Sequence, residues 1–182
     1  MLDFTKIVNY NVLDNKPSLY GQKEIKEMTK TLAQVKAEQL EVQDRWFEEW
    51  NATGEKPNWN YDDVCSQIVA EWLNSLQVGD HAHVCRYTDI EPCTVIKRTA
   101  CSITVRYDKA ELNGTWKPEV VLGGFVGHCV NNHDQVYGGW DIEEDLDGMT
   151  ETFRWSTKYQ RWYNNAGEQL KPEWLKFYDY NF

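Results

Sequence analysis

The chain has 182 residues, of which 14% are aromatic and 26% charged, and its formal net charge at pH 7 is −10. This length is enough for one large domain or two small ones. The mean hydropathy of −0.69 and the lack of a long apolar run argue against a transmembrane helix. The acidic balance disfavours a plain DNA-binding protein and favours a partner with a basic groove, although many soluble proteins are acidic for solubility alone.

The N-terminal sequence MLDFTKIVNY contains Asp3 and no apolar stretch of the kind found in secretory signals. The five cysteines have no paired spacing, which is typical of free thiols in a reducing compartment. We therefore expect a cytoplasmic protein, in a bacterial host cell if the resemblance described below holds, with no membrane partner.

The first 77 residues have the pattern of helices, after a short strand predicted over residues 7–12. Ser18 is predicted to cap a helix that enters near Tyr20, and a stop signal follows at residues 51–54. The apolar stripe of this helix consists of Ile25, Met28, Leu32 and Val35, and continues less regularly to Trp50.

A second helix is predicted to begin after Asn60, whose side chain is a good N-cap. Asp62 and Asp63 lie in its first turn, where the helix dipole favours acidic groups. Its apolar face consists of Val64, Ile68, Trp72 and Leu76. Cys65 lies beside this face, so we predict that it is a core residue.

After Gly79 the period of the apolar residues becomes two, which indicates strands. The alternating segments are residues 81–87, a hairpin of 94–98 and 101–107, a second hairpin of 153–155 and 159–163, and a closing strand at 175–180. We predict an α+β fold. A two-helix arm in residues 1–77 precedes a small antiparallel β-rich domain, either a twisted sheet or a barrel, in residues 78–182.

All four histidines and four of the five cysteines lie between residues 81 and 133. His81, His83 and Cys85 share one face of a strand, and imidazole and thiolate are good zinc ligands. However, no CxxC or HxxxH pair accompanies them. If Ala82 and Val84 face the core, the His81 face is simply exposed to solvent, and we predict no metal site.

The glycine-rich segment 123–133 contains His128, Cys129 and Asn131, which are the residue types of a thiol hydrolase. Neighbouring residues on an extended chain point apart, so His128 does not face the Cys129 sulfur. A polar ligand pocket and a purely structural turn are the alternatives. We predict no catalytic residue and no cofactor.

A run of carboxylates follows in Asp141, Glu143, Glu144, Asp145 and Asp147. The spacing does not fit an EF-hand loop. A row of carboxylates can imitate phosphates and occupy a nucleic-acid channel, whereas the alternative is a solvated loop. We predict that this run binds a basic partner.

Residues 41–50 combine aromatic and acidic side chains: Asp44, Trp46, Glu48, Glu49 and Trp50. Aromatic anchors edged by carboxylates suit an interface with a basic protein, while the alternative is packing onto the second helix or the sheet. A modest basic set, Arg86, Lys97, Arg98, Arg106 and Lys109, is the candidate for a secondary contact with nucleic acid.

Several separated blocks resemble an uncharacterised family of small proteins encoded by bacteriophages and plasmids. The blocks are Val78-Gly-Asp80, Tyr87-Thr-Asp89, residues 94–99, residues 103–110, Gly123-Gly-Phe-Val-Gly-His-Cys129, Phe153-Arg-Trp155 and residues 177–182. The resemblance covers most of the chain after Leu76, and no reaction is attached to the family. In size and acidic character the chain is also similar to type II anti-CRISPR proteins.

The resemblance implies an anti-defence protein of a mobile element. We therefore expect an inhibitor, not an enzyme, that binds a host CRISPR effector nuclease stoichiometrically, as protein or protein–RNA complex. Two alternatives stay open: a small-ligand binder or thiol enzyme using residues 123–133, and a nucleic-acid-binding accessory protein.

Overall fold

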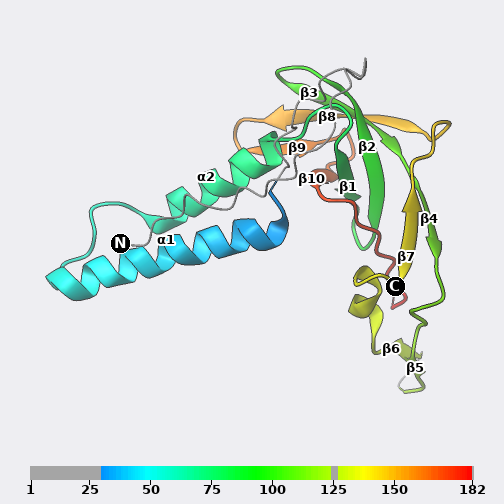
Figure 1. Cartoon of the computed structure of the whole chain (residues 1–182), viewed down its shortest axis with the longest axis horizontal. Helices are drawn as coiled ribbons and strands as arrows, with labels where there is room; N and C mark the ends of the chain where they lie inside the picture. The colour runs from blue at the N-terminus through cyan, green and yellow to red at the C-terminus, as the bar shows by residue number, and fades with distance from the viewer. Residues whose placement is uncertain (1–29, 124–126, 182) are drawn as a thin grey trace, which may run out of the picture.

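The computed structural model describes residues 30–123 and 127–181, in which two helices precede an antiparallel β region (Figure 1). The predicted α+β fold is confirmed. Six strands form a closed barrel in the order β1-β10-β9-β8-β3-β2. Their bounds are β1 His81–Cys85, β2 Ile90–Arg98, β3 Ser102–Tyr107, β8 Thr150–Ser156, β9 Arg161–Tyr163 and β10 Gln169–Pro172.

The first described helix, α1 (Leu32–Thr53), begins with a capping box. Thr31 Oγ1 accepts from the backbone of Gln34, whose side chain accepts from the backbone of Thr31. The helix that contains Val35 therefore begins at Leu32 and not near Tyr20. Ser18, Tyr20 and the strand predicted over residues 7–12 lie outside the described residues. Gly54, at φ 74°, ends the helix where the stop signal predicted it.

Helix α2 (Tyr61–Asn74) is capped by Asn60, and Asp62 and Asp63 lie in its first turn, as predicted. Cys65 is half-buried between the two helices, where its sulfur donates to the carbonyl of Gln39 at 3.7 Å. Cys65 is therefore at the helix–helix contact and not in the core. The fully buried part of the helical face is its C-terminal end, at Trp72, Leu73 and Leu76.

The barrel closes through the pairing of β1 with β10, which sets Ala82 opposite Pro172 and Val84 opposite Leu170. Both predicted hairpins are present, as β2–β3 and β8–β9. The prediction that residues 175–180 close the sheet is wrong, because β10 does so. The segment after β10 lies alongside the barrel and makes a single bridge, from Phe177 to Ile90.

One apolar core joins the helices to the barrel interior. The barrel contributes Ala82, Val84, Cys93, Val95, Ile103, Val105, Phe153, Trp162 and Leu170, and the helices contribute Val35, Trp72, Leu73 and Leu76. Trp162 is fully buried, and its indole N–H donates to the carbonyl of Leu73 at 2.9 Å. The guanidinium of Arg98 donates to the carbonyls of Asn74 and Leu76 and so caps the end of α2. The helical hairpin is thus fastened to the barrel at its base only.

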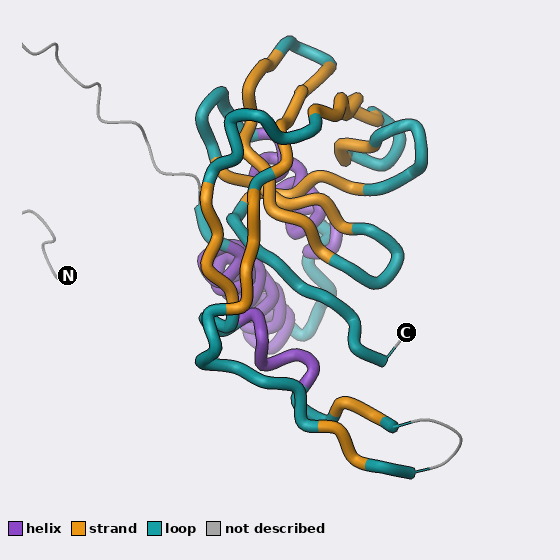
Figure 2. Tube along the Cα trace, turned by 90° about the vertical axis from the view of Figure 1, so that its right-hand side faces the viewer, coloured by secondary structure: helices purple, strands orange, loops and turns teal. Residues whose placement is uncertain are grey.

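The chain leaves the barrel between β3 and β8 to form a second projection, residues 108–149, which we call the insertion arm (Figures 1 and 2). Strands β4 (Lys109–Leu112) and β7 (Trp140–Glu143) form a two-stranded ribbon at its root. A second pair, β5 (Val120–Val121) and β6 (His128–Cys129), lies at its far end, and the short helix η1 (Asn132–Val136) lies between them. The arm and the helical hairpin leave the barrel in different directions.

Within residues 30–123 and 127–181, no helix has both the length and the apolar character that crossing a membrane requires.

Replacing Trp162 by Phe tests the link between barrel and helices. The variant keeps an aromatic ring but leaves the buried carbonyl of Leu73 without its donor, so we expect the free energy of unfolding to fall by about 2–4 kcal/mol. Urea denaturation followed by circular dichroism measures this change. Trp155→Phe, at a half-buried ring, is the matched control, with an expected loss below about 1.5 kcal/mol. Equal losses in the two variants would contradict a special role for the Trp162–Leu73 hydrogen bond.

Candidate functional site

The insertion arm carries most of the net charge of the protein. Residues 108–149 contain nine acidic residues and two lysines, a net charge of −7, whereas the whole chain has −10. The remaining residues therefore carry a net charge of only −3 between them. Because the arm projects from the barrel, this charge is presented away from the rest of the molecule.

The ribbon of the arm sets two carboxylates directly opposite each other. Glu111 of β4 pairs in register with Asp141 of β7. Like charges at facing positions of a sheet are unfavourable, and the polar contact found for Asp141 is the neutral amide of Asn113, at 3.1 Å. Glu143 and Asp147 are exposed, and neither side chain has a hydrogen bond or ion pair with any described residue. Lys109 lies directly opposite Glu143 in the register, but its ion pair is with Asp145. This face of the ribbon therefore carries more carboxylates than its own lysine compensates, and it is complementary to a cationic surface.

Glu144 and Asp145, in the same run, have a structural role instead. Glu144 forms an ion pair with Arg106 at 3.1 Å and lies 3.4 Å from His81, and Asp145 lies 3.5 Å from Lys109. The contacts of Glu144 join the root of the arm to β3 and β1 of the barrel, and the contact of Asp145 lies within the arm. Of the five carboxylates predicted to bind a partner, the structure leaves three outward and uncompensated by a cation: Asp141, Glu143 and Asp147.

A buried amide holds the arm against the C-terminal segment. Gln135 is fully buried, and its Nε2 donates to the carbonyl of Tyr178 at 2.8 Å. Its Oε1 accepts from the backbone of Tyr178 at 2.9 Å and from the indole of Trp140 at 3.2 Å. Asn132, one turn earlier, also bonds to the C-terminal segment, because its side-chain amide donates to Asp179 Oδ1 at 2.7 Å. Both polar atoms of the Gln135 side chain are therefore satisfied, and the arm is held against the segment that follows β10.

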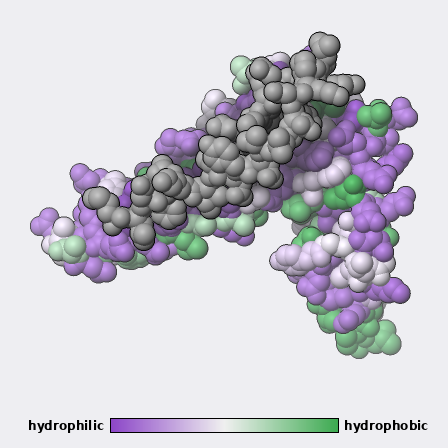
Figure 3. Space-filling model, in the orientation of Figure 1, coloured by the Kyte–Doolittle hydropathy of each residue, from purple (hydrophilic) through white to green (hydrophobic). Residues whose placement is uncertain are grey.

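The far end of the arm exposes four aliphatic side chains, which we call the apolar tip. They are Val120, Val121, Leu122 and Val130, with exposed fractions of 58%, 54%, 89% and 56%. Figure 3 shows the hydrophobic colour gathered at this end of the molecule. A contiguous exposed apolar patch at the end of a projection is typical of a protein interaction site.

In the glycine-rich segment, the side chains of Cys129, Asn131 and His133 make contacts that serve the structure of the arm. Cys129 is buried and His128 exposed on the same strand, so the thiol and the imidazole face opposite sides, as the sequence predicted. The Cys129 sulfur donates to Asn131 Oδ1 at 3.3 Å, and Asn131 also accepts from the backbone of Glu119 at 2.8 Å. His133 stacks on Phe177. These contacts favour the structural turn among the alternatives.

The strand face that carries the zinc candidates is only partly open to solvent, because His81 is exposed and His83 is buried. His83 has an exposed fraction of 4%, and its Nδ1 lies 2.9 Å from the carbonyl of Glu173, which can only accept, so Nδ1 carries the proton. His81 stacks on Trp174 with ring centroids 3.8 Å apart. The prediction that this face meets solvent is therefore wrong for His83. No group of three or more His, Cys, Asp or Glu side chains able to hold a metal occurs in the part of the chain that the structure describes.

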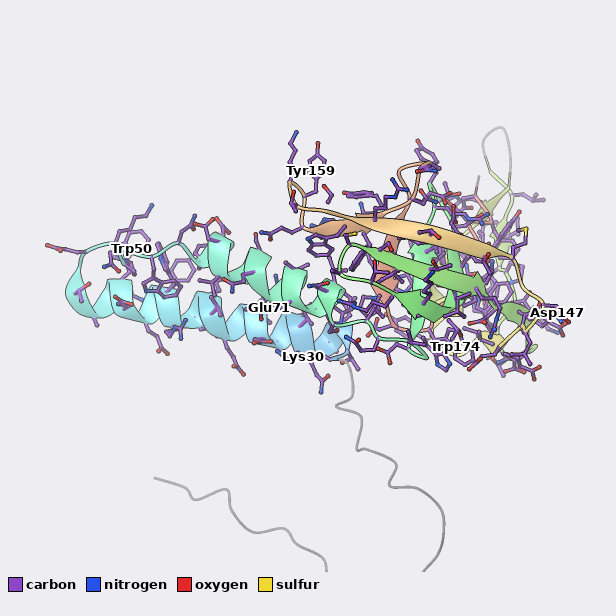
Figure 4. The ribbon with its side chains drawn as sticks, turned by 90° about the horizontal axis from the view of Figure 1, so that it is seen from above. Lys30, Trp50, Glu71, Asp147, Tyr159 and Trp174 are labelled. Atoms are coloured by element: carbon purple, nitrogen blue, oxygen red, sulfur yellow. The ribbon has the colours of Figure 1, made fainter. Side chains whose placement is uncertain are left out.

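At the end of the helical hairpin, Trp46 has an exposed fraction of 7%, and its indole donates to the carbonyl of Trp59 at 3.0 Å. The prediction that Trp46 faces a partner is wrong, because its ring is the centre of an aromatic cluster with Phe47, Trp50 and Tyr61. Trp50 is 38% exposed, Asp44 and Glu48 are exposed, and Glu49 accepts from the Trp59 indole. Figure 4 places Trp50 at the end of the hairpin farthest from the barrel.

The basic set predicted from the sequence is engaged within the protein. Arg86 pairs with Glu168, Arg98 caps α2, Arg106 pairs with Glu144, and Lys109 pairs with Asp145. Only Lys97 of the five makes no hydrogen bond or ion pair with a described residue. Among the described cations without a carboxylate partner, three lie together on the β8–β9 hairpin, namely Arg154, Lys158 and Arg161, and the sequence pattern indicated them only as parts of a hairpin. The alternation of basic and aromatic residues in that hairpin was the signal that could have identified them.

Comparison of the chain with models of known families, with curated proteins and with solved structures finds no match.

Replacing Gln135 by Leu tests how the arm is seated. The change removes every side-chain hydrogen bond of this residue and leaves the backbone of Tyr178 without partners. We expect amide hydrogen exchange in residues 177–181 to accelerate roughly thirty-fold, which corresponds to about 2 kcal/mol, with the amides of β2 and β3 unchanged. Exchange followed by mass spectrometry measures this, with Gln67→Leu on exposed α2 as the control. Unchanged protection in residues 177–181 would contradict the seat.

Burial of His83 predicts a pH dependence of stability. Burial lowers its pKa to about 4, the hydrogen bond to Glu173 raises it in part, and nearby Lys171 lowers it. In the unfolded chain the pKa of His83 is near 6.5, so between pH 6.5 and 4 this histidine binds more protons in the unfolded state than in the folded state. The stability contribution of neutral His83 is complete above pH 6.5 and is lost as the pH falls towards 4, by about 3 kcal/mol.

The measurement is urea denaturation from pH 7.5 to 4.5 for the wild type and His83→Gln. Carboxylates contribute to both curves, so the difference between the two slopes isolates His83. We expect the slope between pH 6.5 and 4.5 to be smaller in the variant. Parallel curves for the two proteins would show that burial does not lower the pKa of His83 in the folded state.

Proposed function

We propose that the protein is a non-catalytic binding protein, and that the insertion arm docks on a basic surface of a nucleic-acid-handling protein. The observation that carries this proposal is the concentration of charge: a net −7 on one projection, with Asp141, Glu143 and Asp147 outward and uncompensated by a cation. A surface that repels itself in the free protein gains most when a cationic partner covers it.

The apolar tip supplies the second component of an interface. Protein interfaces combine a desolvated apolar centre with a polar or charged rim. The arm carries both components: the apolar tip of Val120, Val121, Leu122 and Val130 at its far end, and a ribbon edged by carboxylates at its root. The carboxylates favour fast, oriented encounter, and burial of the tip lowers the rate of dissociation.

The target we propose is an RNA-guided DNA endonuclease of the type II CRISPR class, in line with the resemblance to anti-CRISPR proteins. Such nucleases hold nucleic acid in a positively charged channel and read a short adjacent motif with arginines. An arm with a row of carboxylates fits such a surface and competes with phosphates for it. Inhibition is then stoichiometric, since occupying the channel needs no turnover.

The experiment is a target-DNA cleavage assay with a purified type II nuclease and its guide RNA, with size-exclusion chromatography of the mixture alongside. We expect inhibition that saturates near an equimolar ratio, together with co-elution. Inhibition at far lower ratios would point to a catalytic activity. Neither inhibition nor co-elution would remove this target and leave the arm without its proposed partner.

Charge reversal at Glu111, Glu143 and Asp147 tests which surface binds. We expect this triple Lys variant to raise Kd at least 100-fold and to lose most of its salt dependence, because the outward field of the arm is removed. The matched control makes the same change of charge on α1 at Glu41, Asp44 and Glu48, and should bind as the wild type does. The opposite result would transfer the interface to the helical hairpin.

A further inference from the structure

The β8–β9 hairpin carries three cations without acidic partners. Arg154, Lys158 and Arg161 make no hydrogen bond or ion pair with any residue in 30–123 or 127–181, and Lys158 lies over the ring of Tyr159 at 4.9 Å. Elsewhere, by contrast, Arg86, Arg106 and Lys176 are each paired with a glutamate. The protein has a net charge of −10, yet these three cations form no stabilising ion pair within it.

The two carboxylates of neighbouring strands and turns, Glu151 and Glu168, form hydrogen bonds with other residues and not with these cations. Glu151 accepts from the hydroxyl of Tyr107 at 2.5 Å and from the amide of Asn164 at 2.9 Å. Glu168 accepts from the same amide at 2.7 Å. Asn164 is buried, so this network lies beneath the surface and leaves the outer side of the hairpin cationic.

A cleft lies beside these cations. Its volume is ≈ 510 Å³, and its lining includes Arg154, Trp155, Ser156, Tyr159 and Tyr163. Arg154 and Tyr163 are directly opposite in the strand register, so a guanidinium and a phenol ring share one face. A second cleft of ≈ 420 Å³ runs from Trp155 towards α2 and is lined by Glu71. A third, of ≈ 380 Å³, is lined by Arg161 and also by Asp62, so of the three clefts the first alone has a cation and no carboxylate in its lining.

Aromatic faces are open in the same place. Tyr159 is 57% exposed, and its ring centroid lies 6.1 Å from that of Tyr163 at an interplanar angle of 76°. Figure 4 shows Tyr159 pointing away from the barrel beside the junction with α2, while Asp147 lies at the other end of the barrel. Exposed ring surface next to the unpaired Arg154 offers stacking for bases and charge for a phosphate within one cleft.

We propose that this cleft binds single-stranded nucleic acid. Bases stack on Tyr159 and Tyr163, and the guanidinium group of Arg154 inside the cleft contacts a phosphate. Lys158 and Arg161, on the same hairpin but outside the lining of the cleft, add positive charge beside it. In a duplex the faces of the bases are stacked on each other, so only phosphates would be available to this cleft. The acidic remainder of the protein would also repel the larger number of phosphates that a duplex presents. The site is separate from the insertion arm, and its test does not depend on the nuclease proposal.

The test is fluorescence anisotropy of the full chain with labelled oligo(dT), oligo(U) and a duplex of equal length, from 20 to 200 mM salt. We expect both single strands to bind more tightly than the duplex, with a slope of log K against log salt of about −1.4 to −2 for two or three phosphates. Stronger binding of oligo(U) than of oligo(dT) would identify RNA as the source, and the reverse would identify DNA.

Variants separate stacking from charge. Tyr159→Ala is expected to weaken binding about 5- to 100-fold, and Tyr159→Phe to restore it, because stacking needs the ring and not the hydroxyl. Arg154→Ala with Arg161→Ala is expected to weaken binding tenfold or more and to flatten the salt slope. Lys36→Ala with Lys117→Ala removes the same charge from exposed positions elsewhere and should leave binding unchanged.

Three results would overturn the proposal. The first is no binding of single strands at 20 mM salt by folded wild-type protein. The second is an equal loss in the lysine control and the arginine variant, which would mean that only overall charge matters. The third is equally tight binding of a poly-glutamate peptide, which would assign the cleft to an acidic protein segment.

Discussion

The pairing of β1 with β10 is the constraint on which the rest of the structure depends. It joins strands that are far apart in sequence, and it converts an open antiparallel sheet into a barrel without free edges. The helical hairpin is attached next to β1, and the insertion arm is held by the segment that follows β10. Helix α2 leads directly into β1, and the segment that follows β10 covers His83 through Glu173 and holds the arm through Tyr178. If β10 did not pair, the core would open and both anchors would be lost.

The arm is inserted between two neighbouring strands, and this explains how the barrel tolerates a projection with so many acidic residues. Strands β3 and β8 are paired, so the arm leaves and re-enters the barrel at adjacent positions. Gly148 marks the return, because an added Cβ would meet the carbonyl of Tyr107 at 2.1 Å. The arm is consequently outside the apolar core, and its acidic residues cost the barrel little stability. Its seat is polar and specific, built around Gln135.

The sequence predicted features that local chemistry decides. Asn60, Gly54 and the β2–β3 hairpin lie where their cap and turn signals put them, because a cap or a turn needs only its neighbours. The strand that closes the barrel was missed, since β10 is four residues long and ends in Pro172. The burial of His83 was missed because its cover, Glu173, is 90 residues away. The pairing of charges was hardest to predict, because Arg86 and Arg106 find their carboxylate partners 82 and 38 residues away in sequence.

The separation of charge along β8 has a consequence for how the molecule approaches others. Asp147 precedes this seven-residue strand and Lys158 follows it, so opposite charges are held roughly 20 Å apart by a rigid element. This side of the barrel therefore carries a local electric dipole on an anionic protein. In the field of a complex that contains both basic protein and nucleic acid, a dipole experiences a torque and turns before it touches. Such alignment acts only within a few Debye lengths, about 8 Å each at physiological ionic strength, so it shapes the last step of an encounter.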